Sequence, residues 1–214
     1  MASTTTSRVL KSDTFGAIRV EVSPGRESIV RDTAPAGRWV GVLARWAAHR
    51  EARALGVLRG LEGVPRLLNF DGVRLERSYI AGRPMQEAKP KDPAYFRQAR
   101  VLLRAIHQRG VAHNDLAKEP NWLVTTEGRP ALVDFQIARI AHPRSRMLRL
   151  QAREDLRHLL KHKRTYCPHH VTPIERRLLA RRSWVRNLWF ATGKPVYRWL
   201  TRRVFRWRDN EGQG

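Results

Sequence analysis

The 214-residue sequence contains a single cysteine, Cys167, and no long uninterrupted apolar run. One cysteine excludes an internal disulfide and a cysteine-based zinc site, and it is compatible with a reducing compartment. No uncharged apolar run reaches the length that spans a bilayer, and the polar residues 1–7 lack the apolar core of a signal peptide. We therefore expect a cytoplasmic protein.

Acidic residues are also scarce. Lys and Arg outnumber Asp and Glu 42 to 19, which gives a formal net charge of +23, and the basic residues are densest after about residue 144. Such an excess predicts a polyanionic partner, and nucleic acid, anionic lipid and a nucleotide are all candidates. The alternative is that the charge serves only solubility. The 42% hydrophobic content is enough for the core of one compact domain or two small lobes.

The first part of the chain predicts a small antiparallel sheet. Residues 8–22 alternate apolar and polar around Gly16, which indicates strand, turn and strand. A Ser-Pro-Gly-Arg turn at 23–26 leads into a third strand at 28–32.

A long amphipathic helix is expected next, followed by a second hairpin. The helix is indicated by apolar residues at helical spacing, namely Val42, Leu43, Trp46, Ala47, Ala54, Leu55 and Leu58. Residues 66–70 and 73–80 flank Asp71-Gly72 and predict the hairpin. We interpret residues 81–84 as a flexible joint.

The second part predicts mainly helices. Asp92 and Pro93 are an N-cap and a first helical residue, and Gly110 ends this helix. Its expected buried stripe is Tyr95, Ala99, Leu102, Leu103 and Ile106. A further hairpin is predicted around the turn residues 125–130, and a basic helix at about 146–163.

The residues that point to chemistry lie between these helices. His113-Asn114-Asp115-Leu116 follows an amphipathic helix, Asn121 comes six residues after Asp115, and Asp134 ends the hairpin. Phosphoryl transfer needs a base for the acceptor hydroxyl and hard oxygen ligands for Mg²⁺ beside the phosphates. Asp115 suits the base, and Asn121 and Asp134 suit the metal, because a hairpin returns the chain toward its start. His113 is expected to orient the loop, and Leu116 to anchor it.

The motifs HxxGVxHxDL and VDFxxA in residues 106–138 resemble the catalytic and metal-binding loops of the protein-kinase-like superfamily. Within it they look most like the RIO-type atypical serine/threonine kinases and the bacterial lipopolysaccharide core (Kdo/heptose) kinases. The resemblance covers roughly residues 10–163. It implies ATP, Mg²⁺ and phosphorylation of a hydroxyl, on a compact two-lobed α+β fold. The expected parts are an N-lobe at 1–80, a C-lobe at 81–174 and basic C-terminal helices at 175–214.

The same resemblance implies a nucleotide site in the N-lobe. Arg31 takes the place of the usual third-strand Lys and is expected to pair with Glu51 on the following helix. Gly16 marks the turn that covers the phosphates, and residues 81–84 lie near the hinge that grips adenine. Lys118 is expected to approach the phosphates.

The sequence departs from that pattern at three places. Asn121 is one residue further from Asp115 than usual, so the loop must bulge or another residue must hold the metal. Gln136 replaces the glycine after Asp-Phe, and Gly16 stands alone where a glycine-rich loop is usual. For Arg31 and Glu51 taken alone, the alternative is that they are ordinary solvent-exposed side chains.

The C-terminal residues 175–208 interleave aromatic and basic side chains. Such a pattern is typical of an interfacial helix on anionic lipid, which favours a peripheral site on the cytoplasmic face of the inner membrane. The alternatives are a helical pair packed on the C-lobe and, less favoured, a nucleic-acid surface.

We read the chain first as an ATP-dependent serine/threonine protein kinase of RIO-like type. A lipopolysaccharide core sugar kinase acting on a lipid-linked sugar is the first alternative. A nucleotide-binding pseudokinase scaffold is the second.

Overall fold

The computed structural model describes residues 6–13, 16–23, 26–34 and 38–180, with side chains from residue 27 onward in most of these segments. The chain divides into two compact units, Met1–Thr172 and Pro173–Gly214. In the second unit only α5, Pro173–Ala180, is described, so the predicted tryptophan-rich helices lie almost wholly outside the described residues. No helix among the described residues is long and apolar enough to cross a membrane.

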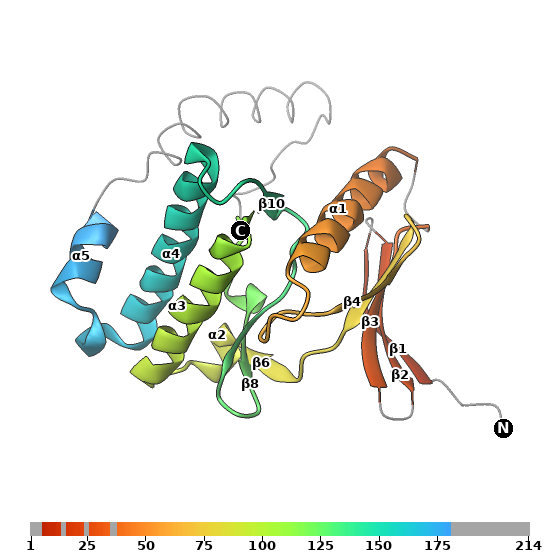
Figure 1. The fold of residues 1–214 in the computed structure, drawn as a ribbon. Coiled ribbons are helices and arrows are strands. Elements are labelled where there is room, and N and C mark those ends of the chain that lie inside the picture. The colour runs from red at the N-terminus through yellow and green to blue at the C-terminus, as the bar shows by residue number, and fades with distance from the viewer. Residues whose placement is uncertain (1–5, 14–15, 24–25, 35–37, 181–214) are drawn as a thin grey trace, which may run out of the picture. The chain divides into compact units, whose positions relative to one another are not determined.

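An antiparallel sheet and one helix form the N-lobe (Figure 1). Five strands pair in the order β1-β2-β3-β5-β4. Their bounds, with those of the helix α1, are β1 Thr6–Asp13, β2 Gly16–Ser23, β3 Arg26–Asp32, α1 Arg38–Val57, β4 Leu67–Phe70 and β5 Arg74–Ser78. The predicted three-stranded start and the second hairpin are thus confirmed.

Helix α1 packs against β4 and β5 through its small residues. Its buried positions include Ala44, Ala48 and Ala52, which let the helix approach the sheet closely. The predicted stripe is wrong in its first turns, because Val42, Leu43 and Trp46 are exposed. Large apolar residues established the helical period, but the alanines form the buried face.

The predicted flexible joint at 81–84 is also wrong. Gly82–Pro84 forms the strand β6, which pairs with β8, Trp122–Thr125, and so joins the small sheet β6-β8-β9. Gly82 permits this pairing, because a Cβ there would lie 2.8 Å from the carbonyl oxygen of Val124.

The C-lobe is built on two long helices, α3 and α4, which lie side by side (Figure 1). Its elements are α2 Met85–Ala88, α3 Pro93–Gln108, β7 Val111–Ala112, η1 Glu119–Asn121, β8, β9 Pro130–Leu132, β10 Arg139–Ile140, α4 Arg146–Tyr166 and η2 Pro168–His170. The Asp92 carboxylate caps α3 by accepting from Ala94 N at 2.7 Å. All five residues of the predicted α3 stripe are buried. The predicted N-cap at Asp92, this buried stripe and the β8–β9 hairpin are therefore confirmed. The predicted α+β two-lobed fold is confirmed as well.

Gly110 closes α3 where two conditions exclude any other residue. Its φ is +78°, and a Cβ would collide with the carbonyl oxygen of Ala141, whose amide donates to Gly110 O. Gly128 in the β8–β9 turn has a similar φ of +73° but open space around it. A side chain at Gly128 would meet backbone strain alone, whereas one at Gly110 would meet both strain and a steric collision.

We predict that Gly110→Ala lowers the free energy of unfolding by roughly 3 kcal/mol, since strain and overpacking add. Gly128→Ala, which meets strain alone, should cost about 1 kcal/mol. Urea denaturation of both variants measures the difference, and equal losses would contradict the packing we assign to Gly110.

Candidate active site

The loop between β7 and η1 is held by hydrogen bonds to one carboxylate of α4. Asp155, 1% exposed, accepts from His113 N at 2.8 Å and from Asn114 N at 3.0 Å, and His107 Nε2 donates to it at 3.1 Å. Asn114 turns the chain with φ +65°. These bonds fix the backbone of the loop immediately before Asp115.

His113 orients the loop, as predicted. Its Nε2 donates to Val133 O at 2.9 Å, and its ring packs on Phe135 with centroids 4.5 Å apart. Complete burial lowers the pKa of His113, because desolvation disfavours the charged ring more than the nearby carboxylates favour it. A neutral ring with its proton on Nε2 therefore connects the loop before Asp115 to the strand end before Asp134.

Asp115 is held by two neighbours. Asn121 Nδ2 donates to Asp115 O at 2.9 Å and to its Oδ2 at 3.1 Å, and Lys118 Nζ lies 2.8 Å from the same Oδ2. The hydrogen bond to Asp115 raises the pKa of Lys118, and the charges of Asp115 and Asp134 add to it. Lys118 thus stays protonated between two carboxylates.

The extra residue before Asn121 is absorbed by the 3₁₀ turn η1. Glu119 in this turn accepts from Tyr166 OH at 2.5 Å, which ties η1 to α4. Because the turn tightens the chain, Asn121 still returns to Asp115. The loop bulges, as one of the two sequence interpretations required, and Asn121 lies next to Asp115.

Asp134 lies beside Asn121 through the backbone. Val133 N donates to Asn121 O at 3.1 Å, and Asp134 itself has φ +68°. Gln136, which stands where a glycine was expected, donates to Asp134 Oδ1 at 2.6 Å. Asp134 therefore adopts the left-handed backbone conformation, and the hydrogen bond from Gln136 holds its carboxylate in place.

The donor set of Asp134 and Asn121 fits Mg²⁺. Gln136 occupies one oxygen of Asp134, and Asn121 uses its amide hydrogens on Asp115, which leaves one carboxylate and one amide oxygen as hard ligands. Among the described residues, no group of three or more His, Cys, Asp and Glu side chains could hold a metal alone. Magnesium commonly takes one or two carboxylates and completes its shell with phosphates and water.

The N-lobe brings the predicted pair together. Arg31 Nε lies 3.8 Å from Glu51 Oε2, and the Glu51 side chain is fully buried. Sequence reasoning missed a second arginine, because Arg77 Nε lies 3.2 Å from Glu51 Oε1. The β3–β5 register places Arg31 opposite Leu75 and Ile29 opposite Arg77, so both arginines share one face of the sheet. The period-two pattern of residues 75 and 77 could have suggested this.

Arg50, the neighbour of Glu51, was missed as well. Its guanidinium donates to Ala138 O at 2.7 Å and to Ile137 O at 3.2 Å, just after the Asp134 loop. Asn114 Nδ2 donates to the same Ile137 O at 3.2 Å. Helix α1 is therefore joined to the segment that follows Asp134.

Gly16 is not brought into the site by any described contact. It begins β2 opposite Asp13, and the turn at 14–15 that it was expected to form lies outside the described residues. Within the described ranges, no hydrogen bond or ion pair joins Arg31 or Glu51 directly to Asp115. Arg50 instead connects α1 to the carbonyl oxygens of Ile137 and Ala138.

A five-stranded antiparallel lobe with one helix, a helical lobe and a carboxylate loop between them define a protein-kinase-like fold. The chain is similar to the Rio2 kinase from Chaetomium thermophilum, with a TM-score of 0.60, 17% identity, and coverage of 82% of this chain and 62% of that one. It is also similar to the Rio2 kinase–ADP/Mg²⁺–phosphoaspartate complex from the same organism, with a TM-score of 0.58, 15% identity, and coverage of 89% and 66%. The chain thus spans just under two thirds of both kinases. No protein-family model and no curated protein matches the sequence.

The shared carboxylate of Glu51 gives a stability prediction. Glu51→Gln keeps the shape but leaves two nearly buried guanidinium groups facing a neutral amide, so we expect unfolding free energy to fall by about 3 kcal/mol. Glu87→Gln on an exposed turn of α2 is the control and should change it by less than about 0.5 kcal/mol. Denaturant titration decides, and a neutral Glu51→Gln would refute the buried charge cluster.

The lowered pKa of His113 predicts a pH dependence. Above its unfolded value of 6.5 both states are neutral at this ring. As pH falls below 6.5 the unfolded chain takes up the proton first, so stability is lost between that value and the lower folded pKa. His113→Gln, which can still donate to Val133 O, should flatten the fall of the melting temperature between about pH 7 and 5.

The exposed His142 supplies the matching control for this experiment, because His142→Gln should leave the slope unchanged. A slope that His113→Gln does not reduce would show that other groups set the acid limit of the fold.

Proposed function

We propose that the chain is an ATP-dependent phosphotransferase that phosphorylates a hydroxyl group. The observation that carries the proposal is the arrangement of Asp115, with Asn121 bonded to it and Asp134 placed beside Asn121 by the Val133 bond. On a protein-kinase-like fold this arrangement joins a base to two oxygen ligands for magnesium.

Asp115 is the catalytic base of this proposal. Its carboxylate accepts the proton of the acceptor hydroxyl as that oxygen attacks the γ-phosphorus, and the bond from phosphorus to the ADP oxygen breaks as ADP leaves. Asn121 and Lys118 fix the carboxylate by binding its Oδ2. Lys118 also keeps a positive charge beside the site, where the transferred group carries negative charge.

Asp134 and Asn121 would hold magnesium together with the phosphates. When bound, the ion neutralises charge on the phosphate oxygens. The remaining protein contacts to the nucleotide are assigned to Arg31 and to the turn before Gly16. Arg31 presents a planar fork rather than the point charge of Lys, so we assign it a bridging contact to phosphate oxygens. The chain entering β6, residues 81–84, is assigned to the adenine.

We place a serine or threonine of a protein first as the acceptor, in line with the likeness to Rio2 kinases. A sugar hydroxyl of a lipid-linked glycan remains the alternative. The argument for that alternative, and for a peripheral membrane site, depended on residues 175–208, most of which lie outside the described residues.

The decisive experiment compares wild type with Asp115→Asn. We expect magnesium-dependent ATP turnover to fall by about 10³-fold or more, because the base is lost while its size is kept. Affinity for ATP, measured by calorimetry, should change by less than about threefold. Assays run with a generic protein acceptor and with a lipid-sugar extract assign the acceptor class.

Glu119→Gln is the matched control, since it removes a carboxylate from the same loop that is bound to α4 instead of facing Asp115. It should retain most of the turnover. If wild type binds ATP with magnesium but Asp115→Asn leaves turnover at the same low level, the chain is a nucleotide-binding scaffold and the proposal fails.

A further inference from the structure

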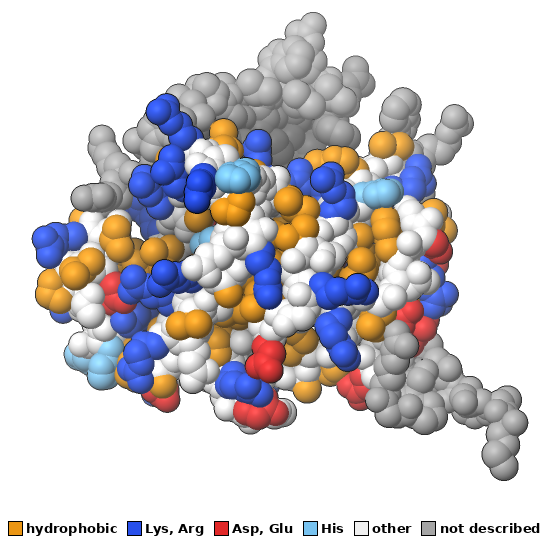
Figure 2. Space-filling model, viewed as in Figure 1, with side chains coloured by type: hydrophobic (Ala, Val, Ile, Leu, Met, Phe, Trp, Pro, Cys, Tyr) orange, Lys and Arg blue, Asp and Glu red, His pale blue; other side chains and the backbone are white. Residues whose placement is uncertain are grey.

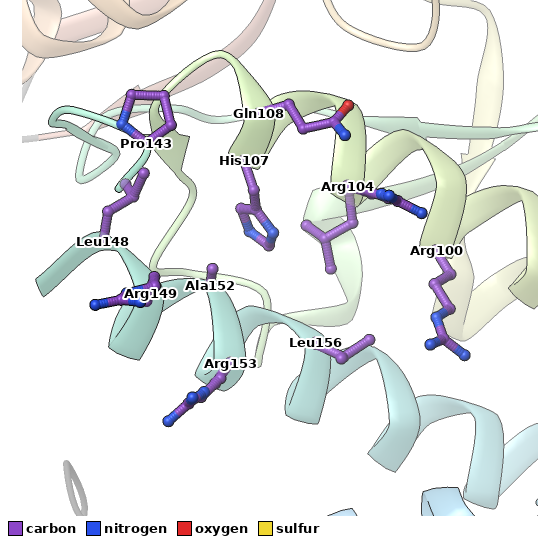
Figure 3. A pocket seen from close by; sticks show the side chains of 11 residues that line it. Arg100, Arg104, His107, Gln108, Pro143, Leu148, Arg149, Ala152, Arg153 and Leu156 are labelled. Carbon is purple, nitrogen blue, oxygen red and sulfur yellow. The ribbon is translucent and has the colours of Figure 1, made fainter. Parts of the chain in front are cut away.

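A groove lies between α3 and α4, away from the candidate active-site residues. It has a volume of about 520 Å³, and its floor is apolar, with the partly exposed Ala152 and Leu156 lying beside the buried Leu103 and Leu148. Figure 3 shows the side chains of α3 and α4 facing each other across it. The span from residue 100 to 108 is about 12 Å along α3, enough for two turns of a helix.

Four arginines border this floor in two rows. Arg100 and Arg104 come from α3, and Arg149 and Arg153 from α4 (Figure 3). All four are exposed, and none has a hydrogen bond or ion pair from its side chain to another described residue. Lys and Arg are abundant over this part of the surface, where few acidic side chains appear (Figure 2).

Among the described residues, no acidic side chain is paired with these arginines. Helix α3 contains no Asp or Glu, and no acidic side chain lines the groove. Asp155 lies behind His107, but its carboxylate is buried and committed to the catalytic loop. Each helix also places two like charges four residues apart, which is unfavourable until an anion lies between them.

We propose that this groove binds an acidic peptide segment of a partner protein. Apolar side chains of the peptide rest on the floor at Ala152 and Leu156, and its carboxylates pair with the arginines on both sides. An amphipathic helix laid into a groove binds by this combination. The arginine fork suits carboxylates in two-point contact.

Other occupants match the groove less well. A nucleic acid would pair with the arginines but would leave the apolar floor unused, because phosphates supply its affinity. A bilayer is planar and does not reach a floor recessed between two helices. The chain's own residues 181–214 carry nine basic and two acidic residues, so their charge opposes the arginines.

Binding is measured with the full-length chain by fluorescence anisotropy. The probe is a labelled synthetic peptide of about four helical turns, with Leu at helical spacing and Glu between. The comparison peptide has the same composition with the Leu spacing scrambled. We expect the patterned peptide to bind at least about tenfold more tightly, and its affinity to fall between about 0.15 M and 0.5 M salt.

The groove variant is Arg104→Glu with Arg153→Glu, which takes one arginine from each row. It should weaken binding of the patterned peptide by about tenfold or more. The matched control, Arg59→Glu with Arg66→Glu, makes the same charge change at two exposed arginines outside the groove and should change affinity by less than about threefold. Unfolding curves verify that both variants fold, and the neutral pair Arg104→Gln with Arg153→Gln should give an intermediate loss.

Equal binding of the two peptides would overturn the proposal, because the floor would then play no part. Equal losses in the two double variants would overturn it as well, since net charge alone would explain them. The proposal would also be overturned if the groove variant lost binding to phosphatidylserine vesicles or to single-stranded RNA but kept its binding to the patterned peptide. None of these readouts needs catalytic activity, so they stand apart from the phosphotransferase proposal.

Discussion

The carboxylate of Asp155 is the constraint on which the candidate site depends. It is buried on α4, yet it binds two backbone amides and one imidazole of other elements, from His113, Asn114 and His107. A buried carboxylate without such donors would be strongly unfavourable, so the loop and α4 stabilise each other. With the backbone fixed at residues 113 and 114, Asp115 follows in a set position, and its side chain needs only Asn121 and Lys118 to be held.

Helix α1 transmits this order to the N-lobe. Glu51 on α1 forms ion pairs with Arg31 and Arg77 of the sheet. Its neighbour Arg50 donates hydrogen bonds to the carbonyl oxygens of residues 137 and 138, which follow Asp134. A rotation of α1 would alter both sets of contacts together. The position of Arg31 and that of the segment after Asp134 are therefore coupled through a single turn of helix.

The sequence was informative where chemistry acts locally. The cap at Asp92, the spacing of the α3 stripe and the hairpin turns each follow from a few neighbouring residues, and the order of His113, Asp115, Asn121 and Asp134 indicated the site. The contacts of Arg77 and Arg50 were not predicted, because strand register and helix rotation decide which side chains meet across elements. The buried face of α1 escaped for the same reason, since alanines close to the sheet outweigh the larger Val42 and Trp46.

The few acidic residues are placed mainly inside the fold and not at the groove. Several carboxylates make contacts inside the fold: Glu51 pairs with two arginines of the N-lobe sheet, Glu119 binds α4 from η1, and Asp155 binds the loop. Asp115 and Asp134 are reserved for the site. A sequence with 19 acidic residues that commits these to internal contacts leaves α3 without one. The arginines of the groove thus face no carboxylate among the described residues, because Asp155 on α4 is used to hold the loop before Asp115, and the proposed acidic partner would supply the missing charges.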